Sequence, residues 1–179
     1  MLPNAEPPPG DLRYLYLHWT AGDYVTVFDA YHVCIGLDPT GAPVARATHD
    51  LRANMRDVRA EPGPYAAHTA GRNSYAIGLA VCGMRDAAPH DFGAFPLRDD
   101  LVALACRTAA ALCAFYRIPV DAGHVRTHAE AALEDGYFGC GEDERWDIAR
   151  LCASPAPLVP ADAVRAGGIL RARIAASSA

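Results

Sequence analysis

The chain has 179 residues, of which 51% are hydrophobic and 21% charged, a composition that is typical of one globular domain with its own core. The formal net charge of −5, without any Lys/Arg cluster, argues against nucleic acid as a partner, because a nucleic-acid binder needs a basic face to displace counterions from phosphates. No apolar stretch approaches the ~20 residues that span a bilayer, so we expect no membrane span.

The first half of the chain predicts a leader and a small sheet. Residues 1–10 (MLPNAEPPPG) lack the basic and apolar regions of a signal peptide and are expected to form a flexible leader. Residues 12–18 and 74–81 are dense in strand-forming side chains. The apolar run 31–37 ends at the turn sequence DPTGAP, after which residues 44–47 are expected to return as the second arm of a hairpin.

Helical patterns follow in the second half. Between Leu97 and Tyr116 apolar residues recur at helical spacing, with acidic residues in the first turn. The segment HVRTHAEAAL (124–133) is expected to pass from a short strand or loop into a helix, and residues 144–151 to form one more short helix. Together these elements predict an α/β fold, a single domain with a central mixed β-sheet flanked by helices.

Residues 11–152 are expected to form this domain, and residues 153–179 a Pro-containing linker with a C-terminal helical tail. We interpret the tail as an appendage or a partner-binding segment. Cys106 and Cys113 lie two turns, roughly 10 Å, apart on the predicted helix, which is too far for a disulfide. We therefore expect free buried thiols among the six cysteines.

Three side chains have the chemistry of a catalytic zinc site, which takes three protein ligands from imidazole, carboxylate or thiolate and leaves a fourth position for water. His18 ends the first predicted strand, His128 follows another plausible strand end, and Asp147 lies in a loop that enters a helix. They are distant in sequence, so their spacing alone does not show that they converge.

Five ordered blocks carry a family resemblance: LHWTAG (17–22), DAYHVCIG (29–36), AAHTAGRNSYAIGLAVCG (66–83), VRTHAE (125–130) and RWDIARL (145–151). The chain resembles the zinc-dependent N-acetylmuramoyl-L-alanine amidases, which include phage amidase endolysins, bacterial recycling amidases and animal peptidoglycan recognition proteins. The resemblance covers residues 11–152 and implies the fold of these proteins, a Zn²⁺ cofactor, and hydrolysis of the amide between N-acetylmuramic acid and L-alanine in peptidoglycan.

Carried over by position, the resemblance implies that His18, His128 and Asp147 are the metal ligands. The small residues that follow His18 would let the loop pass close to the metal and the substrate. His124 competes with His128, since HVRTH holds two histidines four residues apart, but poor helix formers lie between them and the family match selects His128. The alternative role of Asp147 is an N-cap for the helix expected after it.

The resemblance also implies catalytic roles for two side chains. Tyr31 aligns with the tyrosine that endolysins and recognition proteins place beside the zinc water. Recycling amidases instead carry a glutamate where this chain has Cys82, which we expect to be a small buried residue. Arg145 stands where the family often has lysine and could stabilise the oxyanion of the intermediate. Its alternative is a surface ion pair with the acidic run 142–144.

His68, Asn73 and Trp19 are expected to line the substrate cleft, with Asn73 also bracing a loop by hydrogen bonds. His32 would point to the opposite face of its strand from Tyr31 and is expected to be structural, whereas the histidines at positions 49 and 90 receive no role.

The functional prediction is a phage- or prophage-type endolysin whose partner is peptidoglycan or a muropeptide. The alternatives are a cytoplasmic muropeptide-recycling amidase and a non-catalytic peptidoglycan-binding module, which in this fold has typically lost the third ligand. We expect a monomer that is made in the cytoplasm and reaches the wall through a holin or a dedicated secretion route.

Overall fold

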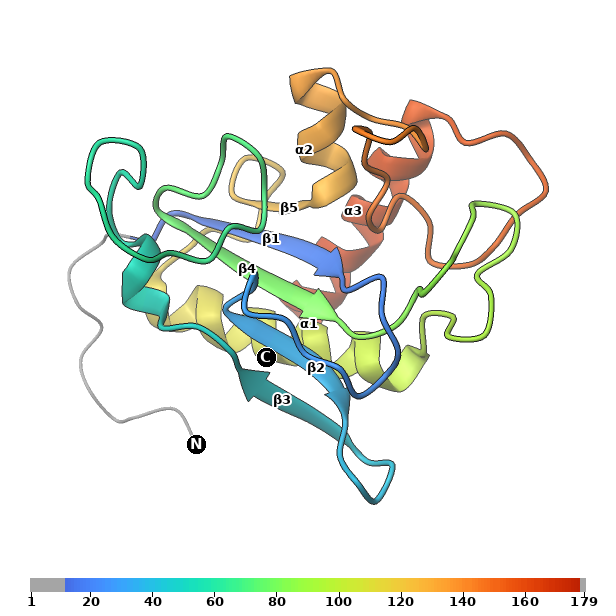
Figure 1. Cartoon of the computed structure of the whole chain (residues 1–179), viewed down its shortest axis with the longest axis horizontal. Coiled ribbons are helices and arrows are strands. Elements are labelled where there is room, and N and C mark those ends of the chain that lie inside the picture. Colours follow the sequence, from blue (N-terminus) through green and yellow to red (C-terminus); the bar gives the residue numbers. More distant parts are fainter. Residues whose placement is uncertain (1–11, 178–179) are drawn as a thin grey trace.

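The computed structural model describes residues 12–177, in which five strands form one mixed sheet in the order β3-β2-β4-β1-β5 (Figure 1). The strands are β1 (Tyr14–Trp19), β2 (Val33–Leu37), β3 (Pro43–Ala47), β4 (Ala76–Val81) and β5 (Val125–Thr127). β3 runs antiparallel to β2, and the other neighbouring strands are parallel. The predicted mixed sheet and its hairpin are confirmed, whereas the leader predicted at residues 1–10 lies outside the described residues.

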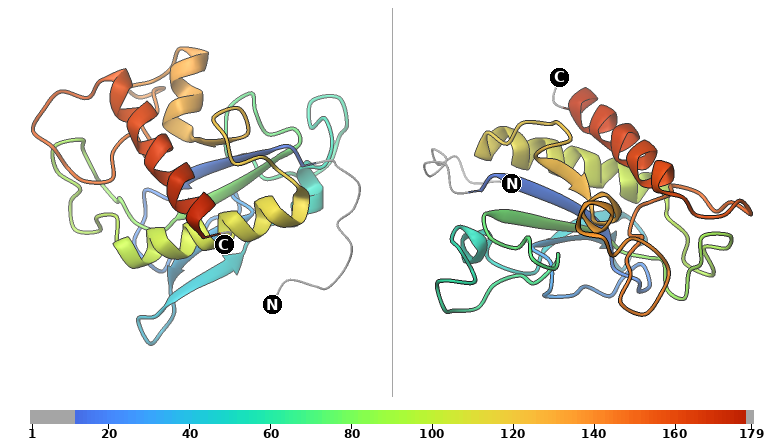
Figure 2. Two further views of the ribbon diagram at one scale, coloured as in Figure 1. Left: turned by 180° about the vertical axis from the view of Figure 1, so that it is seen from behind. Right: turned by 90° about the horizontal axis from the view of Figure 1, so that it is seen from above.

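The helices are α1 (Asp99–Tyr116), α2 (His128–Asp135) and α3 (Pro160–Ala176), with a short 3₁₀-helix η1 (Leu51–Asn54). α1 and α3 cover one face of the sheet, and long loops cover the other, as the view from above shows (Figure 2). α2 begins directly after β5 and also contacts α3 and β1. The prediction of a single domain with a central mixed sheet flanked by helices is confirmed.

Alternation along β1 assigns the two faces of the sheet. Leu15 and Leu17 point toward α1 and belong to the main apolar core, as do Ile77 and Leu79 of β4. The alternate side chains of β1, Tyr16 and His18, point to the loop-covered face. Side chains that can bind a metal or substrate therefore gather on the face that carries no large helix.

α3 packs on the main core of the domain instead of extending from it as an appendage. Leu170 and Ile174 are 3% and 0% exposed within the main core. Small residues form much of the remaining contact, and a Cβ on Gly167 would lie 2.1 Å from the Glu130 carboxylate. Because small residues produce only a weak amphipathic pattern, the sequence did not predict how closely this helix packs.

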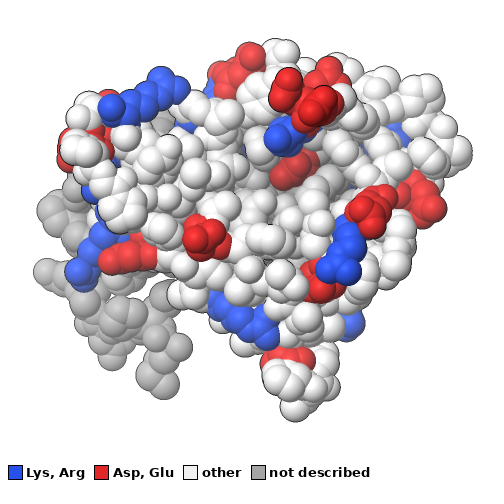
Figure 3. Space-filling view, in the orientation of Figure 1, with Lys and Arg blue, Asp and Glu red and all other residues white. Residues whose placement is uncertain are grey.

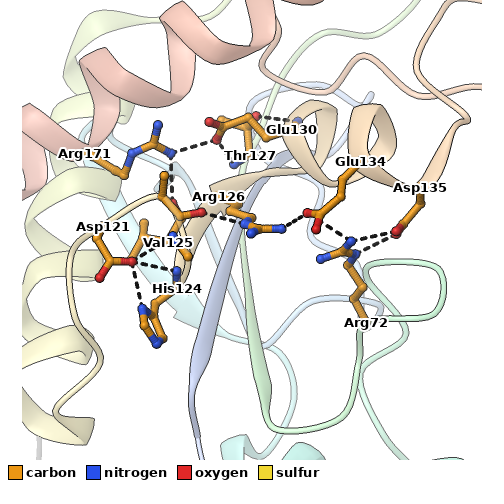
Figure 4. A network of polar contacts seen from close by, with 12 residues as sticks. Arg72, Asp121, His124, Val125, Arg126, Thr127, Glu130, Glu134, Asp135 and Arg171 are labelled. Atoms are coloured by element: carbon orange, nitrogen blue, oxygen red, sulfur yellow. Dashed lines mark hydrogen bonds and ion pairs between the residues drawn. The ribbon is translucent and has the colours of Figure 1, made fainter.

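Polar contacts add to this packing. Arg171 of α3 pairs with Glu130 at 2.9 Å and donates to the Val125 carbonyl at 3.0 Å (Figure 4). Arg150 and Asp162 form a buried ion pair at 2.7 Å. Both bridges connect α3 to segments that carry predicted metal ligands.

Residues 144–151 do not form the short helix that the sequence predicted. The Arg145 amide donates to the Tyr137 carbonyl at 2.9 Å, and Ile148 has a left-handed backbone with φ 58°. A β-branched residue in this region breaks a right-handed helix. Asp147 therefore caps no helix, and its alternative role as an N-cap is removed.

All six cysteines are free thiols. Cys34, Cys82, Cys106 and Cys113 are buried, as expected, whereas Cys140 and Cys152 are exposed. In residues 12–177 we find no helix with the length and hydropathy needed to cross a bilayer.

Candidate metal centre

Strand pairing brings the two predicted histidine ligands together. β1 and β5 are parallel neighbours in which Leu17 lies opposite Thr127, so the next residues, His18 near the end of β1 and His128 directly after β5, lie side by side. His128 is the first residue of α2, whose N-terminus is held by a capping box between Thr127 and Glu130. The Nδ1 atoms of His18 and His128 lie 3.2 Å apart.

Asp147 reaches the same point from a loop. Its backbone carbonyl accepts a hydrogen bond from the Ala129 amide at 3.0 Å, and this amide is one of the free N–H groups in the first turn of α2. The preceding Trp146 packs edge-on against Trp19 with ring centroids 4.5 Å apart. These contacts place Asp147 Oδ2 at 3.2 Å from His128 Nδ1 and 3.6 Å from His18 Nδ1.

The spacing of these three atoms fits one small divalent ion. Ligands at 2.0–2.1 Å around a tetrahedral metal lie about 3.3 Å from one another. The three distances between the donor atoms, 3.2, 3.2 and 3.6 Å, agree with that value. His18, His128 and Asp147 thus form a group that could hold a metal ion, and the convergence that sequence spacing left open is present.

The protonation of the group suits a cation. Burial lowers the pKa of His18 to about 4, although its hydrogen bond to Asp147 acts in the opposite direction, so the imidazole is neutral near pH 7. Burial acts to raise the pKa of Asp147, but hydrogen bonds from His128 and His18 outweigh this effect and hold the pKa below its usual range. His18 therefore has a lone pair available, and Asp147 supplies a negative charge.

An open cleft of about 990 Å³ lies above this group. It opens among the loops that follow the strands, and the middle of the face seen in Figure 3 is largely uncharged with charged side chains around it. Seven of the eight predicted site residues line it: Trp19, Tyr31, His68, Asn73, His128, Arg145 and Asp147. The eighth, His18, is fully buried.

Tyr31 and Arg145 take different positions in this cleft. The Tyr31 ring lies 5.1 Å from the His18 ring, and its hydroxyl donates to the Trp19 carbonyl at 3.2 Å. Burial raises the pKa of Tyr31 well above its usual range, so the phenol keeps its proton. Arg145 is exposed at the rim and donates to the backbone carbonyls of Glu142 and Glu144 at 3.2 and 2.7 Å. Arg145 therefore contacts the acidic run 142–144 through backbone carbonyl oxygens and not through the carboxylates of the expected ion pair.

His68 and Asn73 belong to one braced loop. The Asn73 Oδ1 accepts from the backbone amides of His68 and Thr69 at 3.0 and 2.9 Å, which is the bracing role that the sequence predicted. His68 is buried directly above Gly78 of β4, where a Cβ would lie 2.4 Å from its ring. Burial and the neighbouring imidazoles of His18 and His32 lower the pKa of His68 well below its usual value.

Trp19 lines the cleft, but its indole is 5% exposed and packs against Trp146 and Phe92. Its large side chain supports the cleft wall.

Three other side chains have structural positions. His32 is buried, with Nε2 3.0 Å from Asn54 Oδ1 and Nδ1 accepting from the Gly78 amide at 3.0 Å, in agreement with the structural role expected for it. His124 lies at the opposite end of β5 with Nδ1 2.8 Å from Asp121 Oδ1, away from the ligand group (Figure 4). Cys82 is buried and its thiol donates to the Thr26 carbonyl at 3.4 Å.

Two side chains at the site were not anticipated. Thr69 Oγ1 lies 3.3 Å from His18 Nε2 and 2.9 Å from His68 Nδ1. Its position inside the block AAHTAGRNSYAIGLAVCG was the available signal. Tyr137 lines the cleft with its ring 6.0 Å from that of His128, and its buried hydroxyl has no hydrogen-bond partner within residues 12–177. No sequence pattern singled out Tyr137.

No protein-family model matches the chain, and no curated protein matches it. Among solved structures, a mutant structure of PlyL is similar over 95% of this chain and 90% of that chain, with 15% sequence identity and a TM-score of 0.48. At this level of similarity, a function has to be drawn from the residues of the site.

Proposed function

We propose that the protein is a zinc-dependent N-acetylmuramoyl-L-alanine amidase, which hydrolyses the amide bond between N-acetylmuramic acid and L-alanine in peptidoglycan. The observation that carries this proposal is the spacing of His18 Nδ1, His128 Nδ1 and Asp147 Oδ2 beneath an open cleft. The five ordered sequence blocks support the choice of bond, because they contain all three of these residues.

Two imidazoles and one carboxylate, with access from a cleft, are typical of a catalytic zinc site. When bound, zinc supplies Lewis-acid chemistry, since it polarises a carbonyl oxygen and acidifies water toward a pKa of ~7. The neutral His18 and the ionised Asp147 fit this ion without a further change of protonation.

The remaining side chains handle protons and charge. Tyr31 keeps its proton, so it acts as a hydrogen-bond donor at the cleft wall and not as the base that removes a proton. Arg145 supplies a permanent positive charge at the rim, which stabilises the negative charge that develops on the scissile carbonyl oxygen as water adds. His68 and Asn73 fix the loop that forms the adjoining wall.

The cleft favours the endolysin type over the recycling type. At the position where recycling amidases carry a glutamate, Cys82 is buried and its thiol is engaged with a backbone carbonyl, so it offers no base to the cleft. We therefore propose a monomeric enzyme that acts on polymeric cell wall and reaches it through a holin or a dedicated secretion route.

Digestion of purified sacculi tests the proposal. We expect about one zinc per chain by metal analysis and release of stem peptides with a free N-terminal L-alanine, identified by mass spectrometry. A chelator should abolish the release and added zinc should restore it. Fragments cut within the glycan, or full activity of metal-free protein, would refute the proposal.

Two matched assays separate the alternatives. A recycling amidase would cleave soluble anhydro-muropeptides in preference to sacculi. A non-catalytic binding module would sediment with sacculi and release no peptide. The presence of Asp147 at ligand distance from both histidines argues against the binding module, because that class has typically lost the third ligand.

A further inference from the structure

The second ring nitrogen of His18 has a defined partner. Its Nε2 lies 3.3 Å from Thr69 Oγ1, which also lies 2.9 Å from His68 Nδ1. His18 and Thr69 are 0% and 1% exposed, so water does not compete for these contacts. We propose that Thr69 is a positioning residue, which links His68 to His18 by hydrogen bonds and thereby keeps His18 Nδ1 free to bind the metal. This inference rests on the proposed metal site.

The direction of the hydrogen bonds follows from the single proton of a hydroxyl group, which can donate to only one of the two imidazoles and accepts from the other. If His18 Nδ1 presents a lone pair to the ion, the proton of the ring is on Nε2 and is donated to Thr69 Oγ1. The Thr69 hydroxyl then donates to Nδ1 of His68, whose ring proton is on Nε2. The opposite direction would place a proton on His18 Nδ1 and block the metal.

The loop is built to hold Thr69 in this place. Asn73 Oδ1 accepts from the backbone amide of Thr69 at 2.9 Å, and the absence of a side chain at Gly78 leaves the space that His68 fills. The His68 ring also packs against those of His18 and His32, with centroids 5.4 and 5.6 Å apart. Both neighbours of the hydroxyl are therefore fixed, and so is its orientation.

The other histidine ligand provides a contrast. The Nε2 atom of His128 is buried and has no hydrogen-bond partner among the described residues. Hydrogen bonding to the second nitrogen of a ligating histidine sets its tautomer and typically contributes 10–100-fold to metal affinity. Thr69 provides this interaction for His18 alone.

A pair of substitutions tests the proposal. Thr69→Val replaces the hydroxyl with a methyl group of similar size, and Thr69→Ser keeps the hydroxyl. We expect Thr69→Val to weaken zinc binding about 10–100-fold, measured by competition with a chromophoric chelator, and Thr69→Ser to stay within about threefold of the parent. Thr108→Val, on α1 and away from the site, is the control and should bind as the parent does.

The outcome is separable from the proposed function. If the parent protein binds no zinc, the metal site itself is wrong. If the parent binds zinc and Thr69→Val binds it equally well, or if Thr69→Ser loses as much affinity as Thr69→Val, the role of Thr69 is refuted while the function stands.

A measurement on the parent protein covers the case in which Thr69→Val does not fold. In the zinc-loaded protein, ¹⁵N–¹H correlation spectra of the imidazoles should show protons on Nε2 of both His18 and His68. A proton on His68 Nδ1 would reverse the direction of the hydrogen bonds and overturn the proposal.

Discussion

Gly78 of β4 lies directly against the His68 ring at the cleft, so adding one methyl group there should lower both the stability of the protein and its activity. A Cβ at this position would lie 2.4 Å from His68 Cγ and 2.6 Å from Cδ2. Ordinary carbon contacts are 3.5–4.0 Å, so either the ring or the strand must move by about 1 Å. The strand is restrained because the Gly78 amide donates to His32 Nδ1 at 3.0 Å.

The ring is restrained as well, since His68 Nδ1 lies 2.9 Å from Thr69 Oγ1 and the ring lies between those of Tyr16 and His18. Overpacking of this kind typically costs about 1–3 kcal/mol of the free energy of unfolding. A displacement of about 1 Å near reacting groups typically costs ~100-fold in rate. We therefore expect Gly78→Ala to fold with lower stability and to lose most of its activity.

Urea unfolding and the release of stem peptides from sacculi measure the two effects. Gly168→Ala is the matched control, because Gly168 is in α3 and a Cβ there meets nothing within 4 Å. Alanine should raise the stability of this helix by about 0.5–1 kcal/mol and leave activity unchanged. If Gly78→Ala had the stability and the activity of the parent, the contact between β4 and His68 would not be as described.

Four further predictions concern the site and its protonation. Asp147→Asn should fold but lose its zinc and its activity, because an amide oxygen is a weak zinc ligand; atomic absorption and peptide release measure both. Arg145→Ala should lower kcat more than it raises KM, whereas an equal loss of binding would contradict a role in charge stabilisation. Tyr137→Phe removes a buried hydroxyl that has no partner among residues 12–177, so the free energy of unfolding should stay the same or rise by about 1 kcal/mol in urea unfolding, and a loss of stability would contradict this reading. The pKa of buried His32 is lowered from 6.5 to about 4, mainly by desolvation, so between these pH values the unfolded chain binds a proton that the folded protein does not. In protein freed of metal by a chelator, the free energy of unfolding should thus fall between pH 6.5 and pH 4, and His32 should contribute at most roughly 3 kcal/mol to this fall. A free energy of unfolding in urea that does not change over this pH range would contradict the prediction.

The two histidine ligands could be placed from local signatures. His18 ends a dense apolar run, and His128 follows a short β-rich segment, so both could be placed at strand ends. Their adjacency depends on the pairing of β1 with β5, which sequence patterns do not encode, because alternation defines the faces of a strand and not its neighbours. The ordered blocks of the family resemblance supplied that missing information.

The failures have a common physical origin in contacts between distant segments. Residues 144–151 form an irregular loop because the Asp147 carbonyl accepts from the Ala129 amide and Ile148 turns the backbone, whereas the local sequence resembles a helix. α3 packs through Ala163, Ala166 and Gly167, whose small side chains give little hydrophobic signal. In both cases the segment that makes the deciding contact is distant in the sequence, so a local sequence pattern does not predict the contact.

The surrounding structure supports the three predicted ligands in different ways. His18 is rigid, since a strand fixes its backbone and Thr69 lies against its second nitrogen. His128 begins a capped helix, but its Nε2 has no hydrogen-bond partner in the described part of the chain. Asp147 is placed by one backbone hydrogen bond, by the packing of Trp146 on Trp19 and by the left-handed Ile148, a conformation that costs about 1–3 kcal/mol and persists only where surrounding packing imposes it. Ile148 is 3% exposed within the core under α1 and α3, so this core supplies the packing that holds the strained residue beside Asp147.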